Sequence, residues 1–237
     1  TSGVGNTSSG YNSLSSNTTG DENTATGYGA LFSNTESDGN TAFGAYALNS
    51  TTGASNTGVG HKALYSNAAG DKNVAVGNEA LSANTSGNYH TAVGYQALKT
   101  TATSTGNVAV GYQALYSNTD GGHSVAVGYH ALYSQLAGTE NVGIGYQALY
   151  GLTSAQANAG YGYRALKSIT TGSYNTASGF DASYGISTAT YSVAVGYRAL
   201  QFNNVDSTVG IGVYALKANQ GARNTAVGYE ALKANTT

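Results

Sequence analysis

Residues 224–235 read Asn-Thr-Ala-Val-Gly-Tyr-Glu-Ala-Leu-Lys-Ala-Asn, and variants of this string recur along the whole chain of 237 residues. The glycine at its centre returns every 17 residues, or every 16 in three places. It occupies Gly10, Gly27, Gly44, Gly60, Gly77, Gly94, Gly111, Gly128, Gly145, Gly162, Gly179, Gly196, Gly212 and Gly228. A fixed period of this kind is typical of a solenoid, in which every repeat forms one coil. We therefore expect a single repetitive domain over residues 1–237 with about 14 coils.

The segment around each glycine has the pattern of a β-strand. Counted from the glycine as position 0, position −3 is mostly Thr or Val, position −1 mostly Val or Ile, and position +1 most often Tyr. These positions alternate, so in a strand they share one face, while the Ala or Gly at −2 and the central glycine share the other. β-branched and aromatic residues favour extended chain, and a glycine inside a Thr- and Val-rich segment disfavours a helix.

The rest of each repeat predicts a bend, a second strand and a loop. Leu stands at +4 in 13 of the 14 repeats, the exception being Ser183, and the segment that follows it reads as a shorter strand. Thr, Ser, Gly and Asn then mark a loop. The sequence thus predicts an all-β fold, a parallel β-solenoid or β-roll whose interior is filled mainly by Leu, Val and Ala. The absence of Pro fits strands that must donate hydrogen bonds to their neighbours.

Two rows of asparagine follow from the stacking of coils. Asn stands at −4 in ten repeats and at +7 in a second row. Stacked Asn side chains can bond to one another along the axis or satisfy backbone groups at bends. We interpret both rows as structural ladders; a ligand-binding row is the alternative.

The composition excludes several classes of function. Charged residues are 8% of the chain, against roughly 25% in ordinary proteins, and nine basic against eleven acidic residues give a net charge of −2. Nucleic acids and anionic membranes need a basic surface, so we expect neither as a partner. The chain has no Cys for disulfides or thiolate metal sites. It also has no apolar run long enough to insert into a membrane and no signal-peptide pattern.

No group of residues predicts catalysis, a metal or a cofactor. The four histidines, His61, His90, His123 and His130, fall at different repeat positions and read as surface or ladder substitutions. Most acidic residues are scattered over the loops, and Asp21 and Asp38, one repeat apart, would stack at a loop edge rather than face each other across a cleft. The most irregular repeat, Asn175–Ser183, is interpreted as a packing defect, a kink or a site. We expect no enzyme.

Tyrosine is the residue type most suited to contact. The +1 row and the +5 row supply most of the 20 tyrosines. A tyrosine combines an apolar ring with a polar tip, which suits both subunit interfaces and sugars. The candidate residues for subunit or glycan contact are Tyr95, Tyr112, Tyr129, Tyr146, Tyr163 and Tyr197.

Self-association is the expected partnership. A narrow coil buries little apolar surface per residue, and neither terminal repeat looks like a cap, so strand edges would be open to pairing. We expect a longer parent chain or end-to-end stacking into a filament, and lateral association as a homotrimer.

The repeats resemble those of a known family. Ser124-Val125-Ala126-Val127-Gly128 and Ser192-Val193-Ala194-Val195-Gly196 are similar to the Asn-Ser-Val-Ala-Ile-Gly motif in the heads of trimeric autotransporter adhesins. The longer form, N-T-A-V-G-Y-x-A-L-x-x-N, resembles repeats in phage tail-fibre shafts and related bacterial surface proteins. The resemblance implies a left-handed, trimeric β-roll with an adhesive or spacer role.

The sequence therefore predicts a stiff segment of an extracellular fibre, on a virion or a cell surface, that presents weak multivalent contacts. Cell-surface glycans are among the ligands that such contacts could bind. A self-assembling surface filament is one alternative. An ice- or glycan-binding solenoid with a flat Thr row is another, although the −3 row alternates irregularly between Thr and Val.

Overall fold

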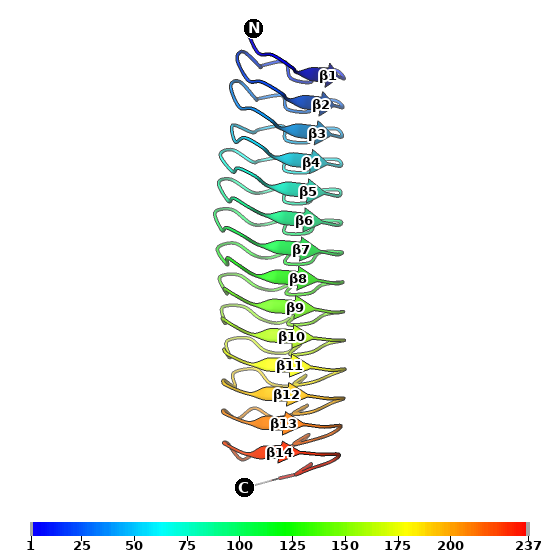
Figure 1. Ribbon diagram of the computed structural model, residues 1–237, viewed down its shortest axis with the longest axis vertical. Coiled ribbons are helices and arrows are strands. Elements are labelled where there is room, and N and C mark those ends of the chain that lie inside the picture. The colour runs from blue at the N-terminus through cyan, green and yellow to red at the C-terminus, as the bar shows by residue number, and fades with distance from the viewer. Residues whose placement is uncertain (1, 236–237) are drawn as a thin grey trace. The chain divides into compact units, whose positions relative to one another are not determined.

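The computed structural model describes residues 2–235 and is an all-β parallel β-solenoid of about 14 coils, which confirms the predicted fold class (Figure 1). Coils are numbered by their central glycines, so that coil n contains strand βn. The strands are β1 (Thr7–Ser9), β2 (Thr24–Thr26), β3 (Thr41–Phe43), β4 (Thr57–Val59), β5 (Val74–Val76), β6 (Thr91–Val93), β7 (Val108–Val110), β8 (Val125–Val127), β9 (Val142–Ile144), β10 (Ala159–Tyr161), β11 (Thr176–Ser178), β12 (Val193–Val195), β13 (Val209–Ile211) and β14 (Thr225–Val227). The left-handed winding of the solenoid and the trimeric state stay predictions.

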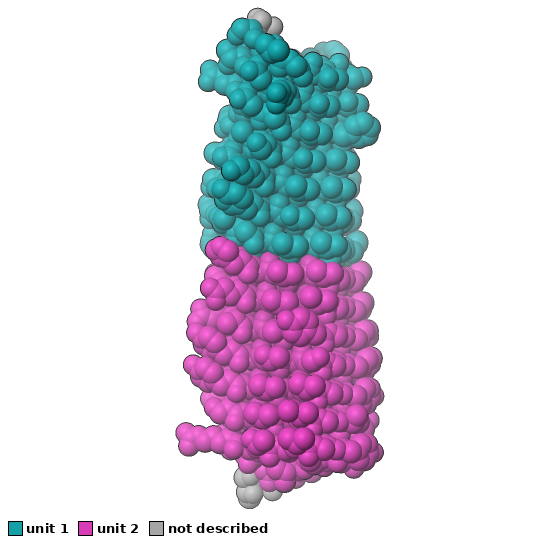
Figure 2. Space-filling model, viewed as in Figure 1, with its two compact units in different colours: residues 1–120 teal, residues 121–237 magenta. Residues whose placement is uncertain are grey.

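The chain divides into two compact units, residues 1–120 and residues 121–237 (Figure 2). Unit 1 contains β1 to β7, each pairing in parallel with the next along the chain. Unit 2 contains β8 to β14, paired in the same way. The single domain expected over residues 1–237 stays a prediction.

The register of the strands is the same in 17- and 16-residue repeats. Ala25 pairs with Ala42, 17 residues later, and Ala42 pairs with Gly58, 16 residues later. In the 16-residue repeat, one residue separates Thr51, at +7 from Gly44, from Gly53, at −7 from Gly60. In a 17-residue repeat, two residues separate these positions. The deletion lies in the loop, so the strands stay aligned.

The core consists mainly of two alanine rows and one leucine row, to which Leu152, Ile169 and Ile186 add apolar side chains at +7. In coil 6 these are Ala92 at −2, Ala97 at +3 and Leu98 at +4, all with no exposed surface. A Cβ placed on Gly58, at −2 in coil 4, would lie 3.2 Å from the Ala63 carbonyl oxygen and 3.2 Å from Leu48 Cγ. Only Ala, Gly or Ser has room at −2, because interiors are packed too closely to accept a larger side chain there.

The expectation that Val fills the interior is wrong. The residues at −3 and −1 point outward and are partly exposed, while −2 is buried in every strand from β2 to β14. Alternation was predicted correctly, but the small-residue face is the inner one, because a Cβ at −2 already lies 3.2 Å from the neighbouring backbone and leucine atoms. The strand also ends at −1, so the Tyr at +1 is not part of it, contrary to the prediction.

The predicted second strand is also absent from the described residues. The segment after the glycine is a series of turns, in which the leucines at +4 have φ between 47° and 54°. The residue at +2 is left-handed as well, as at Gln96. A left-handed non-glycine residue costs about 1–3 kcal/mol. Complete burial of the Leu side chain, which contributes about 1.5–3 kcal/mol, offsets that cost.

The asparagines at −4 form a ladder between coils, as predicted. The side-chain carbonyl of Asn56 accepts a hydrogen bond from the backbone N–H of Asn73 at 2.9 Å, and the Asn56 amide donates to the Gly70 carbonyl at 2.8 Å. The +7 row is bonded too, with Asn84 donating to Asn67 at 2.6 Å. These side chains are buried. They satisfy backbone groups that the turns leave without partners.

Candidate functional site

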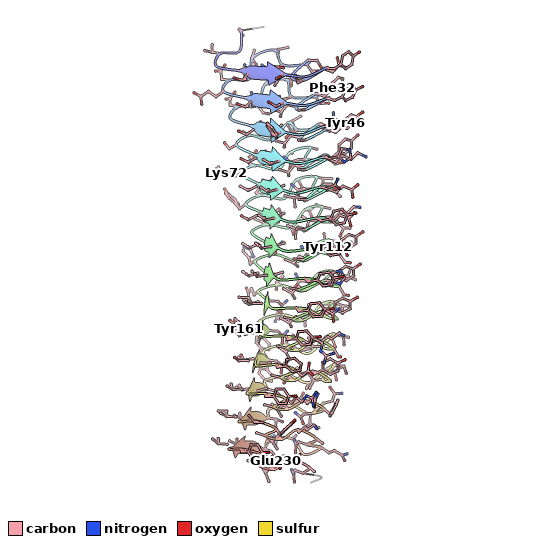
Figure 3. The ribbon with its side chains drawn as sticks, turned by 90° about the vertical axis from the view of Figure 1, so that its right-hand side faces the viewer. Phe32, Tyr46, Lys72, Tyr112, Tyr161 and Glu230 are labelled. Atoms are coloured by element: carbon pink, nitrogen blue, oxygen red, sulfur yellow. The ribbon has the colours of Figure 1, made fainter. Side chains whose placement is uncertain are left out.

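The six candidate tyrosines lie at the turn that follows each strand, and all are partly exposed. Their exposed fractions range from 37% at Tyr197 to 44% at Tyr95. The central glycine that precedes each of them has φ between 127° and 136°, which turns the chain sharply. We call the surface formed by positions +1, +2 and +5 the aromatic edge. In unit 1, Tyr46 and Tyr112 project on this edge while Lys72, at −5, projects on another side (Figure 3).

The structure brings these tyrosines together in stacks within each unit. In unit 1, the ring centroids of Tyr95 and Tyr112 are 5.3 Å apart with an interplanar angle of 11°. In unit 2, Tyr129 and Tyr146 stack at 5.2 Å, and Tyr146 and Tyr163 at 5.0 Å.

Phe180 continues the stack of unit 2. It was not among the contact residues predicted from the sequence. Its ring lies 4.7 Å from that of Tyr163 and 5.4 Å from that of Tyr197. The signal was present in the sequence, because Phe180 occupies position +1 of coil 11. The stack therefore depends on an aromatic ring at each coil and not on the phenol hydroxyl.

The stacked geometry limits what the ladder can contact. Parallel rings about 5 Å apart cover one another's faces, so a ring inside the stack presents its edge and its hydroxyl to solvent. A sugar that stacks on an aromatic residue needs an open ring face. The regular stacks thus suit edge contacts and packing against another surface better than stacking on a sugar.

Asp181, in the irregular repeat Asn175–Ser183, is the centre of an ion-pair cluster on the aromatic edge. Arg164 Nε and Nη2 donate to the two carboxylate oxygens of Asp181, each at 2.8 Å. Asp181 is 1% exposed, and Arg198 Nε lies 3.7 Å from its Oδ2. All three residues occupy +2 in successive coils. The hydrogen bonds to Asp181 raise the pKa of Arg164.

This repeat keeps the conformation of a regular coil. Ser183, in place of Leu, has φ of 51° and donates its backbone N–H to the Ala199 carbonyl at 2.9 Å. The backbone ladder is therefore continuous through the substitution. The charged cluster is held by the protein itself and satisfies the buried carboxylate.

A second ion pair lies on the aromatic edge of unit 1. Lys99 Nζ and Gln96 Nε2 both donate to Glu79 Oε2, each at 2.7 Å. The hydrogen bond from Lys99 lowers the pKa of Glu79, and the same bond raises the pKa of Lys99. Both side chains are partly exposed, so the pair contributes little to stability.

The loop carboxylates have a structural role that sequence reasoning missed. Asp38 Oδ1 accepts the backbone N–H of Asp21 at 2.7 Å, and Asp71 Oδ1 accepts that of Ala54 at 2.8 Å. Both aspartates stand at −6. Asn88 occupies the same position in the next coil, and its side-chain oxygen accepts the backbone N–H of Asp71. Asp21 and Asp38 do stack along the loop edge, as the sequence suggested.

The histidines are dispersed, as their repeat positions indicated. His90 replaces Asn in the −4 ladder: its Nε2 lies 2.8 Å from the Ser104 carbonyl, and its Nδ1 accepts the Asn107 N–H at 3.1 Å. Burial lowers the pKa of His90 to about 4, so the ring is neutral at pH 7. Burial also lowers the pKa of His130, which packs 4.0 Å from the Tyr129 ring.

Comparisons with protein-family models, with curated proteins and with solved structures give no match. Among residues 2–235 no cluster of three His, Cys, Asp or Glu side chains has the geometry of a metal site. The same part of the chain contains no helix of the length and hydropathy needed to cross a bilayer.

Proposed function

We propose that the chain is a structural and adhesive segment of an extracellular fibre, such as a phage tail fibre or a bacterial surface adhesin. It acts as a stiff rod that presents repeated weak contacts and has no catalytic role. The resemblance of strings such as Ser192–Gly196 to adhesin-head repeats supports this, together with the parallel β-solenoid fold. Many identical weak contacts along one rod gain strength by multivalency.

The observation that carries the proposal is the apolar outer face of the strands. Positions −3 and −1 present Thr, Val and Ile outward in almost every coil, and side chains such as Val76, Ile144 and Val195 are 37–39% exposed. A contiguous apolar strip of this kind is unusual on a monomer and is typical of a surface that meets a partner. Lateral association as a homotrimer would cover it.

The aromatic edge supports a packing role in the same assembly. The stacked tyrosines, among them Tyr129, Tyr146 and Tyr163, present their ring edges and hydroxyls in a regular column. Tyrosine at such a surface buries apolar area and keeps a hydrogen-bonding group at its tip. The column is thus suited to a subunit contact that is partly wet.

The molar mass in solution tests the proposal. Sedimentation equilibrium should give three times the chain mass of 23.9 kDa. A monomer at high protein concentration would contradict the lateral assembly. A mass that grows without limit as concentration rises would instead favour the self-assembling filament.

Two matched variants locate the contact. Val93→Lys together with Val110→Lys places charges on the outer face of β6 and β7 and should shift the trimer toward monomer. Ser86→Lys adds a charge in an exposed loop and should leave the mass unchanged. Equal behaviour of the two proteins would exclude the outer face as the interface.

A further inference from the structure

A hollow of about 270 Å³ interrupts the aromatic edge in coils 1 to 3 of unit 1. It is lined by Asn12, Tyr28, Gly29, Phe32, Tyr46 and Asn49. Phe32 and Tyr46 project from the same side of the unit (Figure 3). The volume is slightly below the roughly 300 Å³ at which sites for drug-sized ligands begin. The hollow therefore has room for one small ring.

Two small residues open this hollow. Gly29 stands at +2 between Asn12 and Tyr46 of the neighbouring coils, so one side chain is missing from that column. Ala45 stands at +1 of coil 3, so Tyr28 has no parallel ring above it on that side. The hollow is thus a local departure from a pattern that fills the edge in other coils.

The rings around the hollow are arranged differently from those in the regular stacks. Tyr28 stacks on Tyr11 with one face, at 5.4 Å. Towards coil 3 it meets Tyr46 at 5.1 Å but at an interplanar angle of 67°. This edge-on contact replaces the parallel stacking of the regular coils, and Tyr28 is 48% exposed. Phe32, 39% exposed, forms another apolar wall.

Polar groups surround these apolar walls, and none of the lining residues is charged. Asn49 Nδ2 donates to the Gly29 carbonyl at 2.8 Å, which fixes one side of the hollow. The lining residues Asn12, Tyr28 and Tyr46 also carry amide and phenol groups that can donate and accept hydrogen bonds. A ligand that fits has an apolar ring face, a rim of hydroxyls and no charge.

We infer that this hollow binds the pyranose ring of a neutral sugar. The C–H face of such a ring packs against the open aromatic surfaces, and its hydroxyls bond to the amide and phenol groups. The inference rests on the adhesive part of the proposed function and names its ligand class. Affinity for one ring is weak, with a dissociation constant on the order of millimolar, because the site is shallow and open.

Titration of the full chain with methyl glycosides tests the site. The probes are the methyl pyranosides of glucose, galactose and mannose and of N-acetylglucosamine, followed by NMR chemical-shift changes of the backbone amides. At least one probe should shift the amides of coils 1 to 3, among them those of Gly29 and Tyr46. If none of the four produces a saturable shift there, the inference is wrong.

Gly29→Gln is the decisive variant. Gln occupies +2 in other coils, as at Gln96 and Gln113, with the same left-handed conformation as Gly29. A Cβ at Gly29 would lie 3.2 Å from Tyr46 Cδ1, a side chain that can move by a few tenths of an ångström. The variant should fold normally, fill the hollow and weaken binding by about tenfold or more. Unchanged affinity would overturn the inference.

Two further variants check the aromatic wall. Phe32→Ala should weaken sugar binding, whereas Phe202→Ala, which removes an exposed Phe from unit 2, should not. Equal loss in both would show that binding is not at the hollow. A titration with N-acetylphenylalanine amide tests the competing occupant: binding of this probe without any sugar binding would assign the hollow to an aromatic side chain of a protein partner and overturn the inference.

The glycoside titration and the sedimentation mass distinguish failure of the sugar site from failure of the proposed assembly. Gly29→Gln should keep the sedimentation mass of the unchanged protein, so lost binding with retained mass assigns the effect to the hollow. A protein that assembles as proposed but binds no glycoside would overturn only the inference. A monomer that still binds a glycoside would contradict the fibre assembly and leave the site in place.

Discussion

The side-chain carbonyl of Asn158 accepts two hydrogen bonds from Asn175 of the next coil, one from its backbone N–H and one from its side-chain amide, each at 3.0 Å. The Asn158 amide in turn donates to the Gly172 carbonyl at 2.9 Å. One buried side chain thus satisfies two backbone groups of the neighbouring coil. The −4 ladder connects coils by side chains in addition to the strand pairing.

Asn158→Ala should destabilise the protein by about 2–4 kcal/mol, because it leaves the Asn175 N–H and the Gly172 carbonyl buried without partners. Urea unfolding followed by circular dichroism measures the change. Asn78→Ala is the matched control, since Asn78 is exposed and should change stability by less than about 0.5 kcal/mol. Similar values for both variants would contradict a structural ladder.

His90 predicts a specific pH dependence of stability. Its pKa is about 4 in the folded protein against an ordinary value of 6.5. Above pH 6.5 the ring is neutral in both states and the free energy of unfolding is unaffected. As the pH falls from 6.5 to 4 the unfolded chain binds a proton that the folded chain does not, so stability decreases, by about 3 kcal/mol in total. Below pH 4 this contribution is constant.

His90→Asn isolates that effect. Asn at this position can accept the Asn107 N–H and donate to the Ser104 carbonyl, as the other asparagines of the row do in their coils. The difference in unfolding free energy between the two proteins should change between pH 6.5 and 4 and be flat above that window. A difference that does not vary with pH would contradict the buried neutral histidine.

The Asp181 cluster predicts unequal roles for its two arginines. Arg164→Gln removes a bidentate partner from a carboxylate that is 1% exposed and should cost about 1–3 kcal/mol. Arg198→Gln removes a group 3.7 Å away and should cost less than about 1 kcal/mol. Gln is a natural residue at +2, as at Gln147, so neither change disturbs the backbone. Unfolding in urea measures both, and a larger effect of Arg198→Gln would contradict the geometry.

The period, the position of the strands and the Asn rows could be read from the sequence, because stacking repeats each position at a fixed interval. Which face of each strand points to the interior could not be read from the sequence. Val93 and Ala92 alternate, but alternation alone does not say which side is the interior, and the space left at −2 by the neighbouring leucine and backbone decides it. The turn at Leu98 was missed because a left-handed leucine is rare outside such a repeat.

Within each unit the candidate tyrosines share a column, as the repeat indicated, since the +1 register alone aligns Tyr95 with Tyr112 and Tyr129 with Tyr146. Three other features depend on contacts between coils. They are the coverage of the ring faces, the pairing of Arg164 with Asp181 and the hollow beside Gly29. Each is set by the side-chain positions of the neighbouring coil, which the sequence of one repeat does not give. In each case residues with no evident relation in one repeat are brought together by the next.

The central glycines should tolerate no side chain, whereas a glycine at −2 should tolerate the methyl group of Ala. Gly77 has φ of +138°, and a Cβ there would lie 2.3 Å from the Gly94 carbonyl oxygen of the next coil. Gly77→Ala must therefore separate two coils or change the turn, at a cost of more than about 3 kcal/mol. Gly58→Ala is the matched control, because Gly58 lies within β4, where the equivalent residue of most other strands is Ala and the nearest contacts are 3.2 Å. Urea unfolding should show Gly58→Ala within about 1 kcal/mol of the unchanged protein. If Gly77→Ala does not fold, soluble yield and the circular dichroism spectrum distinguish the two variants, and equal behaviour would contradict the close approach of successive coils.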